Sequence, residues 1–227
     1  VKDKLLIGGT AVTTTAAELN LLDGLTEVIQ GKSEGTNFSG SLLVGHSTTG
    51  TLSTSTYNTG VGLTSLDAIT SGDANTAVGY LSGSAITSGS QNTGIGKNAL
   101  MGVTTTSDNT SVGYNALSAV TGTSNTGLGR NAGFNITSGS GNVMIGYVNA
   151  DSATGDRQLK ITGNDGSTAT TWIDGDSSGN VTMPAELAAA TLDISGAIDI
   201  DGTANLDTVD IDGAVQLDAT LTVGADD

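Results

Sequence analysis

An aliphatic residue followed by glycine returns at a nearly constant interval through the middle of this sequence. The aliphatic residues of these pairs are Val44, Val61, Val78, Ile95, Val112, Leu128 and Ile145. Successive pairs are 17 residues apart, except for one step of 16 from Val112 to Leu128. A fixed period of this length is typical of chains built by stacking one structural unit.

Two further series keep the same interval. A second aliphatic series follows the pairs by eight residues, at Leu52, Ile69, Ile86, Val103, Val120 and Ile136. An asparagine precedes every pair but the first by three residues, at Asn58, Asn75, Asn92, Asn109, Asn125 and Asn142. The short step falls between Val120 and Asn125, so we expect a turn to absorb the missing residue without loss of strand register.

The unit is too short for a paired-helix repeat, and its Asn, Thr, Ser and Gly residues disfavour helix. We therefore predict an all-β fold, a parallel β-roll or β-helix whose coils each have two short strands and two glycine turns. Both aliphatic series should point inward and stack on the next coil, about 4.8 Å away. The asparagines should form a structural ladder of paired side-chain amides. Each paired glycine should have φ > 0 or pack closely on the neighbouring coil.

Several units resemble a known family. The segments Asn-Thr-Ala-Val-Gly-Tyr (75–80), Asn-Thr-Gly-Ile-Gly-Lys-Asn-Ala-Leu (92–100) and Asn-Thr-Ser-Val-Gly-Tyr-Asn-Ala-Leu (109–117) are similar to the head repeats of YadA-like trimeric adhesins, which also occur in bacteriophage tail fibres. The resemblance implies a left-handed parallel β-roll, three chains side by side and a role in attachment. It is specific for the fold and much less specific for the ligand.

We divide the chain into four expected regions: an N-terminal cap with a short helix (1–40), a β-roll of seven repeats (41–150), a β neck (151–184) and an acidic β-shaft (185–227). Thr15 and Glu18 have the spacing of a capping box, and Asp23-Gly24 ends the helical pattern. The segment Thr15–Gly24 also resembles one common in phage tail fibres. This helix either meets its counterparts around a three-fold axis or caps the first coil of a single chain.

The neck and the shaft show alternating aliphatic and polar residues. Strands are expected at 158–163, 172–175 and 179–182, with Trp172 as a core or inter-chain anchor. Pro184 opens a segment that either forms a helical turn or continues the shaft. The acidic pairs Asp199/Asp201 and Asp210/Asp212 lack the remaining ligands of an EF-hand, so we predict a solvated acidic face rather than a calcium site.

Composition excludes several classes of function. The formal net charge of −16 disfavours nucleic acid and anionic membranes as partners. The absence of Cys removes disulfides, thiol nucleophiles and zinc-thiolate sites, and no apolar run is long enough to span a bilayer. We predict no cofactor and no metal. A start at Val1 rather than Met fits a processed product or a fragment.

Large amphipathic residues follow most of the aliphatic-glycine pairs. The slot holds His46, Leu63, Tyr80, Lys97, Tyr114, Arg130 and Tyr147. Five of them, Tyr80, Lys97, Tyr114, Arg130 and Tyr147, are candidate receptor-binding residues, because Tyr and Arg offer stacking faces and hydrogen bonds to a sugar or a protein. The alternative role of this column is packing between protomers.

The predicted function is that of a structural component of a phage tail fibre or virion appendage in host-cell attachment. The chain would form an extracellular homotrimeric rod, partnered by other tail or fibre proteins and by a glycan or protein receptor on the host. One alternative is a fragment of a bacterial trimeric surface adhesin. Another is a tailspike that degrades polysaccharide, although no catalytic motif is present and we predict that the chain is not an enzyme.

Overall fold

The computed structural model describes residues 6–7, 10–11, 31–33, 37–46 and 48–184. Within these ranges all regular elements are β-strands and none is a helix. The helix expected at 15–23, the segment after Pro184 and the acidic shaft at 185–227 lie outside the described residues. The proposed boundaries of the four regions stay a prediction.

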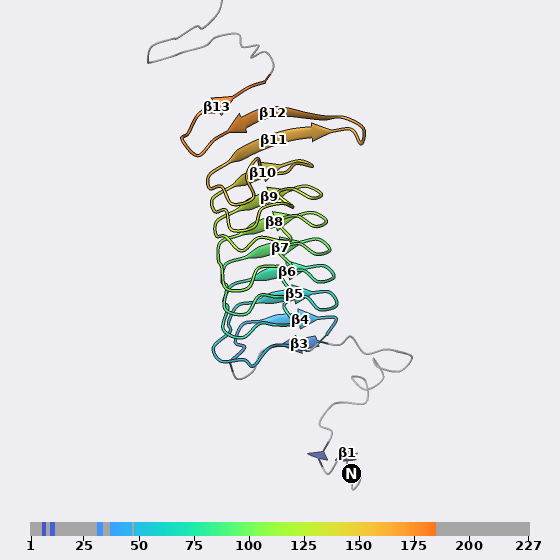
Figure 1. The fold of residues 1–227 in the computed structure, drawn as a ribbon. Coiled ribbons are helices and arrows are strands. Elements are labelled where there is room, and N and C mark those ends of the chain that lie inside the picture. Colours follow the sequence, from blue (N-terminus) through green and yellow to red (C-terminus); the bar gives the residue numbers. More distant parts are fainter. Residues whose placement is uncertain (1–5, 8–9, 12–30, 34–36, 47, 185–227) are drawn as a thin grey trace, which may run out of the picture. The chain divides into compact units, whose positions relative to one another are not determined.

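Eleven strands form one sheet whose order follows the chain from β3 to β13 (Figure 1). The strands are β3 (Gly31–Ser33), β4 (Leu42–Val44), β5 (Thr59–Val61), β6 (Thr76–Val78), β7 (Thr93–Ile95), β8 (Thr110–Val112), β9 (Thr126–Leu128), β10 (Val143–Ile145), β11 (Leu159–Asn164), β12 (Ala169–Gly175) and β13 (Val181–Thr182). Neighbours from β4 to β11 are parallel, whereas β3, β12 and β13 pair antiparallel. The predicted all-β stack of parallel coils is confirmed.

Two further strands precede this sheet in the chain. β1 (Leu6–Ile7) and β2 (Thr10–Ala11) pair antiparallel with each other as a separate two-stranded sheet. The expected cap region thus contains short strands among its described residues.

Each coil contributes one strand of three residues, so the prediction of two strands per coil is wrong. The opposite wall is a run of turns that bonds to the next coil through its backbone, for example from Thr70 N–H to Thr87 O at 2.9 Å. Residues in this wall adopt left-handed backbone angles, with φ of 57° at Thr64 and 55° at Leu66. These angles interrupt an extended strand while leaving the coil-to-coil hydrogen bonds in place.

The two aliphatic series face opposite ways. Ile69 and Ile86, from the second series, are almost fully buried, as predicted. The series that belongs to the Val-Gly pairs points outward, with Val61 38% and Ile95 40% exposed. Side chains alternate along a strand, and in β5 only the middle residue is buried. The prediction that both series point inward is therefore wrong for the pairs.

The thin interior explains this orientation. The middle residues of β4 and β10 are Leu43 and Met144, both fully buried, whereas those of β5 to β9 are small, namely Gly60, Ala77, Gly94, Ser111 and Gly127. Gly94 and Gly127 face leucines of the opposite wall, and a Cβ placed on Gly127 would lie 2.7 Å from Leu117 Cγ. Because the leucines already fill the space, a valine at the middle position would collide with them.

The glycine of each pair has both properties expected of it. Gly79 has a φ of 131°, and a Cβ there would lie 2.6 Å from the carbonyl oxygen of Gly96 in the next coil. Only glycine fits both the backbone angle and the close approach.

The missing residue of the short coil lies in the predicted turn. The Asn109 side chain donates to Gly122 O, 13 residues ahead, whereas that of Asn75 donates to Gly89 O, 14 residues ahead. Val120 N–H still bonds to Leu117 O, so the coil is regular up to that point. β8 and β9 remain paired in register, so the shortening does not disturb the sheet.

The neck contains the three strands that the sequence predicts. β11 and β12 form an antiparallel hairpin, and β13 adds to its far edge. Trp172, in β12, lies over Gly163 and is 57% exposed, so it is not a core residue of this chain. Its role as an anchor between chains stays a prediction.

Candidate binding surface

A hydrogen-bonded ladder of asparagines lies inside the stack. Each predicted ladder residue is fully buried: Asn58, Asn75, Asn92, Asn109, Asn125 and Asn142. The Nδ2 group of Asn75 donates to Asn58 Oδ1 at 3.0 Å, and the backbone N–H of Asn75 donates to the same oxygen at 2.9 Å. The same two bonds recur at every later rung.

The ladder satisfies its buried amides almost completely. The second Nδ2 hydrogen of Asn75 goes to Gly89 O at 2.9 Å, so both hydrogens are donated while Oδ1 accepts two bonds from the next rung. Gln158 adds a further rung that the sequence reading missed, with its backbone N–H 2.8 Å from Asn142 Oδ1. An aspartate carboxylate in such a rung would lack the donors, which is why amides occupy it.

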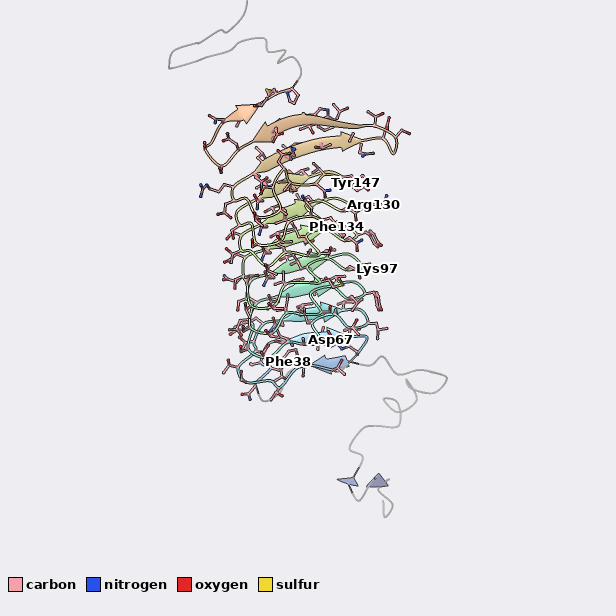
Figure 2. All side chains as sticks on the ribbon, viewed as in Figure 1. Phe38, Asp67, Lys97, Arg130, Phe134 and Tyr147 are labelled. Carbon is pink, nitrogen blue, oxygen red and sulfur yellow. The ribbon has the colours of Figure 1, made fainter. Side chains whose placement is uncertain are left out.

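The five candidate receptor-binding residues lie together on the outside of the stack. We call Tyr80, Lys97, Tyr114, Arg130 and Tyr147 the amphipathic column; Lys97, Arg130 and Tyr147 follow one edge of the coils in Figure 2. All five side chains are exposed, and the tyrosines retain 43% to 46% of their accessible surface. The column presents aromatic faces and cationic groups to solvent in consecutive coils.

Cations and rings alternate within the amphipathic column. Lys97 Nζ lies 5.7 Å from the ring centre of Tyr80 and 5.8 Å from that of Tyr114. Arg130 Cζ lies 5.2 Å from the ring centre of Tyr147. At these distances the ring faces attract the cations, which orders long side chains that would otherwise sample many rotamers.

The first two residues of the slot depart from the column. His46 is 5% exposed; its Nε2 donates to Ser65 O at 2.7 Å and its Nδ1 lies 2.9 Å from Thr48 Oγ1. A carbonyl oxygen only accepts, so Nε2 carries the proton. His46 is thus a structural residue of the first coil, and Leu63 continues the slot as an apolar side chain that is 57% exposed.

A second asparagine series lies next to the amphipathic column and was missed by the sequence reading. Asn98, Asn115 and Asn131 directly follow three column residues and have φ of 60°, 54° and 55°. Asn98 Nδ2 donates to Asn115 Oδ1 at 2.8 Å. Their spacing of 17 and 16 residues was the available signal, and tolerance of left-handed angles is the physical reason for Asn there.

The outward aliphatic residues of the pairs form a ridge along the sheet. We define the aliphatic ridge as Val44, Val61, Val78, Ile95, Val112, Leu128 and Ile145. Val61, Ile95, Val112 and Leu128 are each 37% to 40% exposed, and none of the seven carries a charge. Each residue of the column follows a ridge residue by two positions, so the two surfaces run side by side along the coils.

Carboxylates collect at the neck. Asp151, Asp156, Asp174 and Asp176 line a hollow of about 390 Å³. Lys160 bonds to Asp151 and lies 3.4 Å from Asp174 Oδ2. Partial burial pulls the pKa of Lys160 down, but the hydrogen bond and the charge of Asp151, with help from Asp174, outweigh it and raise that pKa above 10.5.

Two exposed turns of the neck hold further carboxylates. Backbone N–H groups of Thr168 and Ser167 lower the pKa of Asp165, and the side-chain amide of Asn180 lowers that of Asp176. These contacts are those of ordinary turns. Across the described ranges, no group of three or more His, Cys, Asp or Glu side chains is placed to hold a metal ion.

Comparisons with known proteins give no match. No protein-family model, no curated protein and no solved structure matches the chain. In the part of the chain that the structure describes, no helix is long and apolar enough to cross a lipid bilayer.

Proposed function

We propose that this chain is a structural component of a phage tail fibre or a related virion appendage. Three identical chains form a rigid rod that acts in attachment to the host cell. The observation that carries the proposal is the aliphatic ridge, a continuous apolar series on the outer face of the sheet that the described residues leave partly exposed. The resemblance of the repeats to YadA-like heads and to phage fibres supplies the class of protein.

The ridge is suited to another copy of the same chain. Its residues recur at the spacing of the parallel strands, about 4.8 Å, so the rungs of one copy meet the rungs of another at the same interval. The threonines that share the outer face in β5 to β9 are uncharged, and association would bury no ionised group. Each buried Å² of apolar surface contributes about 25 cal/mol.

The internal ladder supports a mechanical role. Its rungs join each coil to the next through buried side-chain and backbone bonds, and bending the stack would open several of them at once. Stacked repeats resist deformation because every unit is held by both neighbours. A stiff rod can hold a binding surface away from the particle that carries it.

The mass of the native particle tests the proposal. Wild-type chain should have the mass of three copies, and Ile95→Lys should give single chains because three ammonium groups would meet in an apolar interface. Met101→Lys is the matched control: it changes an apolar residue of the same coil that is 38% exposed, against 40% for Ile95, but lies outside the ridge. A wild-type monomer, or equal effects of both variants, would overturn the rod.

The attachment role has its own assay. Fluorescently labelled wild-type chain should be retained on cells from a bacterial panel, and the monomeric Ile95→Lys variant should wash off more readily because it has lost multivalent contact. Surface polysaccharide incubated with the chain should release no reducing ends. Steady release of oligosaccharide would instead identify a tailspike enzyme.

A further inference from the structure

The distribution of charge in the coils singles out the amphipathic column. Residues 41–150 contain one lysine and one arginine, Lys97 and Arg130, and both stand in the column. The same range contains three acidic residues, Asp67, Asp73 and Asp108. Within the described residues the ion pairs involve Lys160 alone, so no carboxylate of these ranges neutralises either column cation.

The rings hold these cations without cancelling their charge. Lys97 lies between Tyr80 and Tyr114, and Arg130 lies against Tyr147. A cation–π contact orients the charged group but leaves its N–H donors free for an anion. Exposed tyrosines beside it add flat faces for sugar rings and hydroxyl groups for hydrogen bonds.

The spacing of the cations fits a long ligand with sparse charge. Lys97 follows β7 and Arg130 follows β9, two strands further on, which places their coils about 10 Å apart along the stack. That separation is comparable with the length of a disaccharide. A linear polymer lying along the column could meet one cation with every second sugar and stack its rings on the tyrosines between them.

We propose that the amphipathic column binds a linear acidic polysaccharide, with uronic carboxylates on Lys97 and Arg130 and sugar rings on the tyrosines. The inference deepens the attachment role by naming the class of receptor. A dense polyanion such as nucleic acid fits less well, because the chain carries a net charge of −16 and offers two cations in the coils. A neutral glycan would leave both cations without a partner.

Hyaluronate, which carries a uronic carboxylate on every second sugar, tests the proposal, with its fully methyl-esterified form as a neutral polymer of the same sugars. Calorimetry on the full chain at low salt should show binding of the acid polymer and at least about fivefold weaker binding of the ester. Lys97→Met and Arg130→Met keep much of the side-chain length, and each should weaken binding about fivefold. Arg157→Met is the control, since Arg157 is an exposed cation outside the column that bonds to Ser177 O.

The outcomes separate this inference from the proposed rod. Equal binding of acid and ester, no binding of either, or equal effects of Lys97→Met and Arg157→Met would overturn the glycan site. A change of particle mass in Lys97→Met or Tyr114→Leu would also overturn it, because the column would then be a contact between copies. A wild-type monomer that binds the acid polymer through Lys97 would keep the site and overturn the rod.

Discussion

Replacing Asn92 by aspartate probes the ladder at its centre. Asn92 is fully buried; its Nδ2 donates to Asn75 Oδ1 at 3.1 Å and to Thr106 O at 2.9 Å. An ionised carboxylate has the same shape but donates nothing, so both acceptors lose a bond. Asn75 Oδ1 keeps the bond from the backbone N–H of Asn92 at 3.0 Å, but its other lone pair now faces a carboxylate oxygen, as does Thr106 O. At about 2 kcal/mol for each of the two lost bonds, we expect Asn92→Asp to lower the free energy of unfolding by about 4 kcal/mol near neutral pH.

The loss should depend on pH in a defined direction. Burial without a compensating cation raises the pKa of the introduced carboxyl above its unfolded value of about 3.9. Between the two pKa values the folded state binds more protons than the unfolded state. Stability must therefore fall as pH rises, by up to about 1.4 kcal/mol per pH unit. The variant should be closest to wild type in acid.

Denaturant unfolding at one fixed protein concentration measures this effect. The series runs between about pH 5 and about pH 7.5, above the pI of about 4.1, where net charge keeps the chain soluble. Gln91→Glu is the control, because it adds the same charge at the exposed neighbouring residue. If Asn92→Asp lost no more stability than Gln91→Glu, or lost it equally at every pH, paired amides would not be what holds the coils together.

Two other changes test the turns and the neck. Gly79→Ala forces a φ of 131° on a residue whose Cβ has no room, and thermal unfolding should show a loss of at least about 3 kcal/mol. Gly166 has a φ of 97° with open space around it, so Gly166→Ala should cost about 1 kcal/mol. An equal loss of stability in the two variants would show that the close packing around Gly79 contributes nothing. Lys160→Met should cost about 1 kcal/mol at low salt and less at high salt. Since the pKa of Lys160 is raised, wild type should keep this contribution at neutral pH and lose it only above pH 10.5; an unchanged difference there contradicts the ion pair.

Period and residue type were enough to predict the stack and its ladder. An amide that recurs at one interval can pair with its own copy in the next coil, as Asn75 does with Asn58, and no other element has to be known. The glycine after each aliphatic residue was likewise readable, because a φ > 0 and a close backbone contact both demand it.

Hydrophobicity alone did not show which side chains of each strand face the interior. In a strand of three residues such as Thr93–Ile95, either the ends or the middle can face inward, and the larger side chains suggested the wrong choice. The small middle residue Gly94 was the better signal, because a thin interior admits little from the sheet once the opposite wall supplies leucine. His46 is a second case that hydrophobicity does not predict. Its slot holds exposed residues in the later coils, whereas the His46 ring is buried because Nε2 donates to Ser65 O.

The closed ends of the sheet give the stack a definite length. Antiparallel β3 at one end, and the β11–β12 hairpin with β13 at the other, replace the parallel edges onto which another coil would add. Between these stops, the coils that carry Asn58 to Asn142 offer their neighbours the same amide, glycine and strand. Whole units can therefore be duplicated or deleted in the gene. Each added or removed unit would change the length of the stack by about 4.8 Å.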